Sequence, residues 1–461
     1  MSQLPTQPLS PLDGRYQSAV SALGEHLSEA GLNRARVRVE IEWLIFQTAH
    51  GFFGTAALDE QQQATHRAIV RDFDASSIEE LAATERTTKH DVKAVEYFVR
   101  ARLDDLGLGH LSELTHFACT SEDINNLSYA LTVKDAVEQV WLPGYDAVIE
   151  RLSSLAKQHQ YVPMLSRTHG QPATPTTMGK ELAVFVHRLR RVRQQIADTE
   201  YLGKFSGATG NFAAHVIALP DVDWPSCSSQ FVEGLGLGWN PLTTQIESHD
   251  WQAELYARIS HTNRILHNLA TDIWSYISMG YFRQIPEPGA TGSSTMPHKI
   301  NPIRFENAEA NLELSSAVLD SLAATLVTSR LQRDLTDSST QRNIGVGLGH
   351  SLLALDNLHR GLGDIDLDAE RLRADLDANW EVLGEAIQTV IRGEIVAGHS
   401  SITDPYALLK ELTRGHRIGA DELRSFVSGL DISDAAKERL IALTPDQYTG
   451  LSAELVKVLA D

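Results

Sequence analysis

The stretch from Trp251 to Met279 contains no glycine or proline, and it constrains the fold of this chain more than any other feature. Apolar residues such as Leu255, Ile259 and Leu266 keep to one face of a helix along it. At about 1.5 Å per residue, a helix of this length extends roughly 43 Å, which is more than a small globular domain needs. The chain must therefore cover a long apolar helix face.

Three more segments are typical of long helices. Residues 182–196 place apolar side chains at alternating spacings of three and four, as along a bundle seam. Residues 302–330 keep leucines on one face, and residues 120–141 open with Thr120 and Asp123 spaced like a capping box. These segments predict an elongated helical bundle, shared between subunits because such long apolar faces need partners.

The rest of the chain fits an all-α fold. Alternating strand patterns are scarce, and residues 34–49, which alternate in part, fit a helix better. We predict three domains: an N-terminal helical domain (1–110), a central long-helix bundle (111–365) and a C-terminal helical domain (366–461). Shorter helices are expected in the last domain, one of them beginning at Thr444.

Composition limits the function classes. The net charge of −20, from 40 basic and 60 acidic residues, argues against non-specific binding to nucleic acid or anionic membranes. An anionic small substrate remains compatible, because a local basic cluster can oppose the global sign. Cys119 and Cys227 form no CxxC unit, and the N-terminus has no apolar leader segment. We expect a cytoplasmic protein without disulfides.

Several common catalytic motifs are missing from the sequence. The glycine clusters at 234–238 and 345–349 lack the spacing and flanking pattern of a nucleotide-binding loop. There is no GxSxG elbow, no HExxH and no His/Cys/Asp cluster with metal-ligand spacing. We therefore expect neither a metal nor a cofactor.

Residues 292–307 combine hydroxyls, an imidazole, an ammonium, amides and a carboxylate in one short segment. Asn301 is a good N-cap and Pro302 suits the first helical position, so a loop is expected to lead into a helix N-terminus. Such a terminus favours anions. The alternative from polarity alone is a capped, solvated loop.

Four more polar clusters share this chemistry: residues 87–91, 120–121, 167–172 and 332–342. Each has a plain structural alternative, since Asp91 or Thr120 can cap a helix and a loop histidine is more often only solvated. Taken together, imidazoles, hydroxyls, Lys, Arg and amides suit an anionic substrate with carboxylates or phosphate that is processed by proton transfers.

The segment from Gly292 to Asn301, GSSTMPHKIN, followed by Glu306, resembles the signature SSxMPxKxN of the fumarase/aspartase superfamily. Five segments elsewhere in the chain resemble one family of this superfamily, the adenylosuccinate lyases in their longer bacterial form. They are RTHGQPATP (167–175), KHDVKAVEY (89–97), TSEDINN (120–126), RDLTDS (333–338) and DGRY (13–16). The resemblance covers nearly the whole chain.

The resemblance implies a homotetramer of three-domain, all-α subunits whose active sites each draw residues from three subunits. It implies β-elimination of fumarate from adenylosuccinate, giving AMP, and from the succinyl-carboxamide ribotide SAICAR, giving AICAR, in purine biosynthesis. No cofactor takes part in this chemistry.

The resemblance also implies residue roles. The base falls on Ser293, with Ser294 as the alternative, and the acid falls on His169. The ammonium of Lys299, loop amides and a helix N-terminus would stabilise a serine alkoxide and the dianionic carbanion. The loop 286–299, rich in Gly and Pro, is expected to act as a lid. Substrate-binding roles are implied for Arg15, Tyr16, Lys89, His90, Asp91, Thr120, Ser121, Gln245, Lys299, Asn301, Asn307, Arg333, Ser338 and Arg342.

Three alternatives remain beside this interpretation. Another lyase of the superfamily, such as argininosuccinate lyase or fumarase, would share the signature. A non-catalytic structural protein of the superfamily would keep the bundle and could lose the serine or the histidine, whereas Ser293 and His169 are both present. A helical scaffold for protein partners would explain the bundle but not the signature loop.

Overall fold

A computed structural model describes residues 8–286, 296, 299–413 and 418–460 of the chain. The predicted all-α class is confirmed, because strands in this part of the chain form only three two-stranded sheets. The chain divides into two compact units: Met1–Asp146, Val192–His267 and Ala308–Asp356 form the first, and the remaining segments form the second. The three-domain division stays a prediction.

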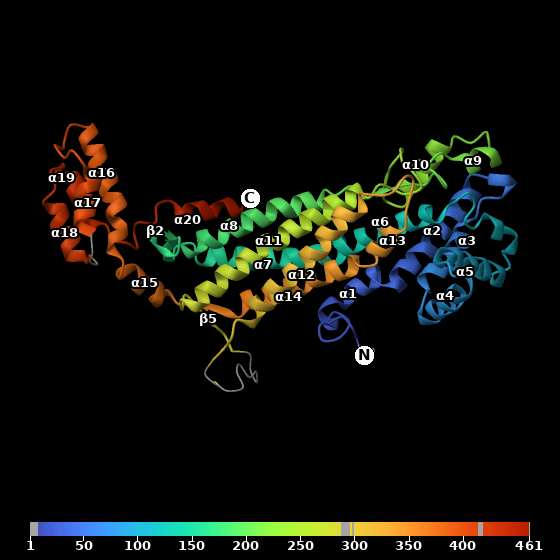
Figure 1. The fold of residues 1–461 in the computed structure, drawn as a ribbon, viewed down its shortest axis with the longest axis horizontal. Coiled ribbons are helices and arrows are strands. Elements are labelled where there is room, and N and C mark those ends of the chain that lie inside the picture. Colours follow the sequence, from blue (N-terminus) through green and yellow to red (C-terminus); the bar gives the residue numbers. More distant parts are fainter. Residues whose placement is uncertain (1–7, 287–295, 297–298, 414–417, 461) are drawn as a thin grey trace. The chain divides into compact units, whose positions relative to one another are not determined.

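Figure 1 traces the helices in chain order from blue to red. The first unit holds α1 (Gln17–Leu27), α2 (Glu29–Ala49), η1 (Phe52–Gly54), α3 (Glu60–Arg71), α4 (Ala75–Thr88), α5 (Asp91–Asp105), η2 (Gly109–Leu114), α6 (Ser121–Ala136), the π-turn η3 (Val137–Trp141), β3 (Leu202–Gly203), α9 (Ala213–Ala218), α10 (Trp224–Gly234), β4 (Gly238–Trp239) and α13 (Thr336–Gln341). Five helices contribute residues to both units: α7 (Leu142–Gln158), α8 (Met178–Ala197), α11 (Asp250–Ser278), α12 (Ile303–Leu326) and α14 (Ile344–Gly363).

The second unit holds the shorter elements of the C-terminal part of the chain and two small sheets. These elements are β1 (Pro163–Thr168), β2 (Gln171–Thr177), β5 (Phe282–Gln284), β6 (Ile365–Leu367), α15 (Ala369–Asp377), η4 (Trp380–Leu383), α16 (Gly384–Val396), α17 (Pro405–Thr413), α18 (Ala420–Ser428), α19 (Asp434–Ala442), α20 (Ser452–Leu455) and η5 (Val456–Ala460). β1 pairs antiparallel with β2, and β5 with β6.

The predicted long helices are confirmed, with small differences at their ends. The helix expected over 251–279 is α11, and the one expected over 34–49 is α2, which begins earlier because the Ser28 hydroxyl accepts from the Gly31 N–H at 3.1 Å. The helix expected over 120–141 does not end at Trp141. A π-turn, in which the Leu142 N–H donates to the Val137 carbonyl, leads directly into α7. The i→i+5 pattern accommodates one extra residue without ending the helix.

Buried polar side chains join the long helices of the first unit, where α11, α12 and α14 lie side by side (Figure 1). The Trp141 Nε1–H donates to the Ser351 hydroxyl at 2.9 Å, and that hydroxyl donates to the Asn263 Oδ1 at 2.8 Å. The Asn263 amide then donates to the Ser315 hydroxyl at 2.9 Å, and Ser315 donates to the Gly347 carbonyl at 2.8 Å. A satisfied buried network of this kind fixes the register of the helices.

The glycines at 345–349 lie inside α14 and serve helix packing. A Cβ on Gly347 would be 2.9 Å from a methyl of Leu319, and one on Gly349 would be 2.9 Å from a methyl of Leu12. The close approach of neighbouring elements therefore explains this glycine cluster, in agreement with the rejection of a nucleotide-binding loop.

The C-terminal region forms its own apolar cluster, which includes Leu383, Ile391 and Val427. The helix expected to begin at Thr444 is wrong. Residues 445–447 form a turn in which the Gln447 N–H donates to the Thr444 carbonyl at 3.0 Å and the Thr444 hydroxyl bonds to Asp446. These local bonds stabilise the turn instead of a helix start. In the described part of the chain, every helix is too short or too polar to span a bilayer.

Candidate active site

A pocket of about 330 Å³ opens in the first unit, where α4 ends and α5, α6 and α13 begin. Residues expected from the sequence to bind substrate form most of its wall: Lys89, His90, Asp91, Ser121, Arg333, Ser338 and Arg342. The rest of the lining consists of Glu85, Asn125, Leu335 and Ser339. Segments more than two hundred residues apart in the sequence therefore meet at one site.

The corner between α4 and α5 places Lys89 and His90. Lys89 ends α4 in the left-handed conformation, with φ of 55°. His90 is the N-cap of α5, and its Nδ1 accepts from the Lys93 N–H at 3.2 Å. Because Nδ1 accepts, the neutral ring carries its proton on Nε2, which remains a donor. The capping role considered for Asp91 thus belongs to His90.

The start of α6 supplies Ser121. Thr120 is the N-cap of this helix, and its backbone N–H donates to the Asp123 carboxylate at 2.8 Å, so the predicted capping role of this pair is confirmed. The N-termini of α5 and α6 both begin at pocket-lining residues. The positive ends of the two helix dipoles favour an anionic ligand there.

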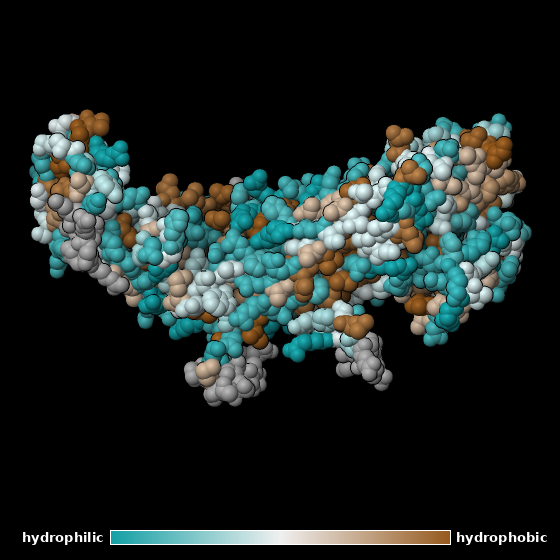
Figure 2. All heavy atoms as spheres, in the orientation of Figure 1, coloured by the Kyte–Doolittle hydropathy of each residue, from teal (hydrophilic) through white to brown (hydrophobic). Residues whose placement is uncertain are grey.

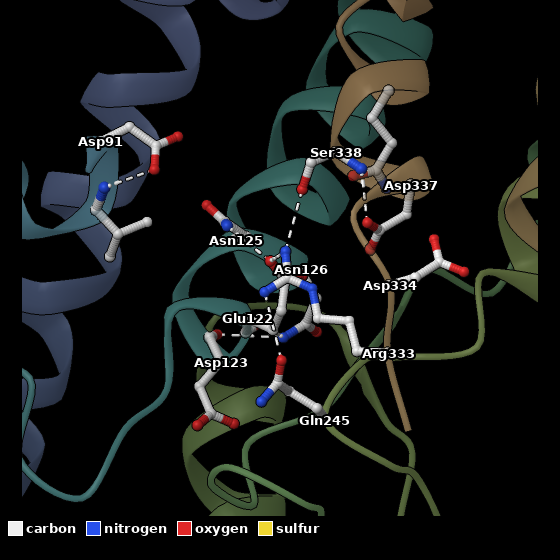
Figure 3. Close-up of polar contacts among 12 residues, drawn as sticks. Asp91, Glu122, Asp123, Asn125, Asn126, Gln245, Arg333, Asp334, Asp337 and Ser338 are labelled. Atoms are coloured by element: carbon white, nitrogen blue, oxygen red, sulfur yellow. Dashed lines mark hydrogen bonds and ion pairs between the residues drawn. The ribbon is translucent and has the colours of Figure 1, made fainter. Parts of the chain in front are cut away.

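Arg333 is held by three side chains (Figure 3). Its Nη2 forms an ion pair with Glu122 at 2.8 Å and donates to the Ser338 hydroxyl at 3.1 Å, while its Nη1 donates to Gln245 at 3.4 Å. Burial raises the pKa of Glu122, and the Arg333 charge and a hydrogen bond from Asn125 oppose that rise. The geometry fixes the guanidinium in one orientation at the pocket wall.

Asp91 lies between two arginines. Its Oδ2 accepts from Arg36 at 2.8 Å and from Arg342 at 3.3 Å, and its Oδ1 accepts from the Val92 N–H at 2.9 Å. Burial acts to raise the pKa of Asp91, but Arg36, the Val92 N–H and Arg342 together bring that pKa below its ordinary value. The carboxylate is therefore ionised at neutral pH, and it also orients Arg342.

Gln245 is positioned by a buried ion pair. The Lys204 ammonium contacts Asp123 at 2.9 Å, with both side chains fully buried, and it donates to the carbonyls of Gly207 at 2.7 Å and Gln245 at 2.8 Å. The Gln245 amide in turn donates to the Ala208 carbonyl at 2.9 Å. Lys204 thus joins the loop near Gly207 to the segment that presents Gln245 to Arg333.

His169 belongs to the second unit, at the tip of the β1–β2 hairpin. Thr168 pairs with Gln171, so His169 and Gly170 form a two-residue turn. Both have positive φ, 53° for His169 and 74° for Gly170, as a type I′ turn requires. The imidazole of His169 is exposed. A rigid hairpin therefore presents the predicted acid.

Two contacts attach this hairpin to the C-terminal helices of the same unit. Arg167 forms an ion pair with Asp375 of α15, and the Tyr281 hydroxyl donates to the same carboxylate. Burial and the Asp375 charge raise the pKa of Tyr281 to about 12, against the effect of Arg167. The Thr174 hydroxyl on β2 bonds to Glu385. Both strands of the hairpin are therefore fixed near its tip.

The remaining predicted residues lie elsewhere. In the second unit, Lys299 is exposed before α12, while Asn301 and Asn307 are half-buried. Ser293 and Ser294 lie outside the described residues, and the loop expected as a lid is described only at 286, 296 and 299.

Arg15 and Tyr16 precede α1 in the first unit. Tyr16 is the N-cap residue of that helix, and the exposed Arg15 guanidinium lies 5.9 Å from the centre of the Tyr16 ring. Neither residue is among those that line the pocket in the described part of the chain. Within the same part, no group of three or more His, Cys, Asp or Glu side chains could hold a metal ion.

Comparison with known proteins decides the family. Residues 14–315 match the lyase family model, and residues 329–449 match the model described as adenylosuccinate lyase C-terminal. The chain is 47% identical over 453 residues to adenylosuccinate lyase of Escherichia coli K12 and 46% identical over 459 residues to that of Haemophilus influenzae, covering 98% of both chains in each case. The chain belongs to the adenylosuccinate lyase family.

Solved structures extend the likeness to the fold of the wider superfamily. A fumarate lyase from Mesorhizobium matches with a TM-score of 0.75 at 19% identity, covering 95% of this chain and 97% of that one. A 3-carboxy-cis,cis-muconate lactonizing enzyme from Pseudomonas putida matches with a TM-score of 0.73 at 20% identity, covering 96% and 97%. At these identities the likeness concerns the fold alone, and it agrees with the predicted superfamily.

No role was assigned from the sequence to three buried charged residues near the pocket: Arg36, Glu122 and Lys204. Arg36 stands among Ala35, Val37 and other apolar residues of α2. A charged residue within an otherwise buried helix face needs a partner, so the sequence around Arg36 indicates a buried ion pair or hydrogen bond at this position. The partner itself could not be read from the sequence.

Proposed function

We propose that this chain catalyses β-elimination of fumarate from adenylosuccinate, giving AMP, and from SAICAR, giving AICAR, in purine biosynthesis. The observation that carries the proposal is the pocket in which Lys89, His90, Arg333 and Arg342 meet beside two helix N-termini. Such a set of donors suits a ligand with a phosphate and carboxylates. Relatives of 46–47% identity carry the name of this activity.

The charge of the pocket is consistent with this substrate class. The chain as a whole has a net charge of −20, yet two guanidinium groups and one ammonium line this pocket. Asp91 and Glu122 hold the two guanidinium groups by ion pairs, and a guanidinium carries five N–H donors, more than one ion pair uses. An incoming phosphate or carboxylate oxygen can accept such a donor.

The chemistry assigned to the second unit follows from the elimination itself. A base removes a proton from the carbon next to a carboxylate, the C–N bond breaks, and an acid protonates the departing nitrogen. We assign the base to Ser293 and the acid to His169, with Lys299 stabilising negative charge. Asn301 and Asn307 are proposed to bind substrate, and so are Arg15, Tyr16, Thr120, Ser121, Gln245 and Ser338. No cofactor is required.

We further propose that the protein is a cytoplasmic homotetramer whose active sites draw on three subunits. Large apolar side chains are exposed on the long helices: Val184 of α8, Trp274 of α11, and Ile303 and Leu314 of α12. On the side of the molecule that Figure 2 views, hydrophobic side chains are scattered among mainly hydrophilic ones. Exposed apolar residues on long helices favour association with further copies of the chain.

Turnover of adenylosuccinate, followed by ultraviolet absorbance, tests the function. We expect release of AMP and fumarate, and no comparable turnover of argininosuccinate or hydration of fumarate. Absence of AMP release would refute the proposal. Turnover of argininosuccinate or fumarate in its place would favour another lyase of the superfamily.

A further inference from the structure

Three buried polar side chains form a continuous connection at the pocket wall, and one of them, Asn125, is itself a lining residue. Arg36 of α2 is 2% exposed, and Glu122 and Asn125 of α6 are 2% and 6% exposed. The Arg36 Nε–H donates to the Asn125 Oδ1 at 2.9 Å, and the Asn125 amide donates to the Glu122 Oε1 at 2.8 Å. We call these three residues the buried relay.

Each end of the buried relay holds a residue of the pocket wall. At one end, Arg36 Nη2 donates to Asp91 at 2.8 Å, and Asp91 also accepts from Arg342. At the other end, the Glu122 Oε1 is 2.8 Å from Arg333 Nη2. The relay therefore links the Asp91–Arg342 side of the pocket to the Arg333 side through ion pairs and hydrogen bonds.

The energetics explain why such a connection transmits position. A carboxylate or guanidinium taken out of water is tolerated only when its partners are in good geometry. The third guanidinium nitrogen of Arg36, Nη1, donates to the Asn33 Oδ1 at 2.9 Å. All three guanidinium nitrogens are thus hydrogen-bonded to oxygens, and neither end of the relay can shift without breaking one of these contacts.

We propose that Arg36, Asn125 and Glu122 are positioning residues that set the separation between Arg333 and the Asp91–Arg342 pair, and thereby the spacing between the anionic groups of the substrate that the pocket accepts. This inference rests on the proposed function, since it assigns Arg333 and Arg342 to substrate anions. The relay residues act through Arg333, Asp91 and Arg342 and not on the reacting atoms.

The first test is Glu122→Gln, which keeps the shape of the side chain and removes its charge. Arg333 then loses its ion pair, and its guanidinium is held less firmly. We expect KM for adenylosuccinate to rise on the order of 10-fold while kcat changes less than about 3-fold, as for an interaction made equally in the ground and transition states. The control is Glu96→Gln, which alters another buried carboxylate, one that pairs with Lys93 and Arg100 away from the pocket lining. It should leave both constants unchanged.

A double-mutant cycle separates positioning from a general effect on structure. If Glu122 acts through Arg333, then Glu122→Gln should have almost no further effect on KM in an Arg333→Met background. Arg36→Lys serves as a second variant, because a lysine keeps the charge but cannot bind Asp91, Asn125 and Asn33 together. It should also raise KM while keeping most of kcat.

The outcomes can be told apart. If the wild-type protein does not turn over adenylosuccinate, the proposed function fails, whatever the variants do. If the wild type is active but Glu122→Gln leaves KM unchanged, lowers kcat alone, or adds its full effect to that of Arg333→Met, the positioning role is overturned. Calorimetric titration of wild type and Glu122→Gln with AMP gives an independent readout, and a roughly 10-fold weaker affinity of the variant supports the relay, whereas equal affinities contradict it.

Discussion

Arg167, two residues before His169, forms an ion pair with Asp375 of α15, and Tyr281 donates to the same carboxylate. The tip end of the hairpin that carries His169 is therefore attached to a helix more than two hundred residues away in the sequence. Together with the β1–β2 pairing, this attachment holds the tip in place.

Replacing Asp375 by Asn should weaken that attachment. The neutral amide loses the charge interaction with Arg167, so the imidazole of His169 becomes less well positioned, and we expect kcat to fall on the order of 10-fold. Steady-state kinetics on adenylosuccinate measure this. Asp377→Asn is the control, because Asp377 is exposed on the same helix. Equal kinetics of the two variants would contradict a positioning role for Asp375.

Removing either proposed acid–base group should abolish turnover. His169→Asn and Ser293→Ala are each expected to lower kcat by at least about 1000-fold while leaving the assembly intact, as measured by light scattering. If active sites combine residues of several subunits, mixing the two inactive variants should restore part of the activity. Failure to recover any activity after demonstrated subunit exchange would argue against shared sites, and a near-normal rate for Ser293→Ala would argue against its role as base.

The buried pair of Lys204 and Asp123 should contribute strongly to stability. Lys204→Met leaves the Asp123 carboxylate buried without its charge partner, and we expect the free energy of unfolding to fall by about 3–5 kcal/mol. Urea denaturation at a fixed protein concentration measures the change. Lys457→Met alters an ammonium that pairs with Glu454 at the surface and should leave the denaturation midpoint nearly unchanged. A similar midpoint for both variants would show that burial of the pair is unimportant.

His215 should make the fold sensitive to acid. The side chain is fully buried among aromatic rings, neither ring nitrogen has a hydrogen-bond partner among the described residues, and burial lowers its pKa from 6.5 to about 4. The unfolded chain therefore binds the proton more readily, so stability is complete above about pH 6.5 and falls as pH drops toward about 4, by at most about 3 kcal/mol.

Replacement of His215 by Leu tests the predicted fall in stability at low pH. The variant should show a flatter dependence of the unfolding free energy on pH between 6.5 and 4, because a group that gains a proton on unfolding has been removed. The exposed His187→Leu should keep the slope of the wild type. An unchanged slope for His215→Leu would show that another group causes the acid sensitivity.

The long helices could be predicted because their apolar periodicity is a local property of the sequence, and α11 agrees with its predicted range to one residue at each end. The ends of the helices were harder to predict from the sequence. α12 ends at Leu326, short of the expected Arg330, where the Ser329 hydroxyl and the Asp334 carboxylate accept from backbone N–H groups and hold a non-helical turn. Such side-chain bonds compete with the helix but leave no periodic signal.

For the pocket, too, some residues could be predicted from the sequence and others could not. Seven of its eleven lining residues were identified through the family motifs, whereas Glu85, Asn125, Leu335 and Ser339 were not. The residues that hold them in place were not identified, because Arg36 meets Asp91 and Asn125 only in the folded chain, across separations of 55 and 89 positions. Contacts of this kind depend on tertiary structure, and neither composition nor spacing reveals them.

The left-handed conformation of His169 limits how this chain can change during evolution. Histidine is among the few residue types other than glycine that are enriched in that conformation, so the turn and the proposed proton transfer both depend on one residue type. A shift of the imidazole by one position toward the N-terminus would move it out of the turn and onto strand β1. Insertions or deletions at this tip should consequently be rare among active descendants, even where the two strands diverge freely.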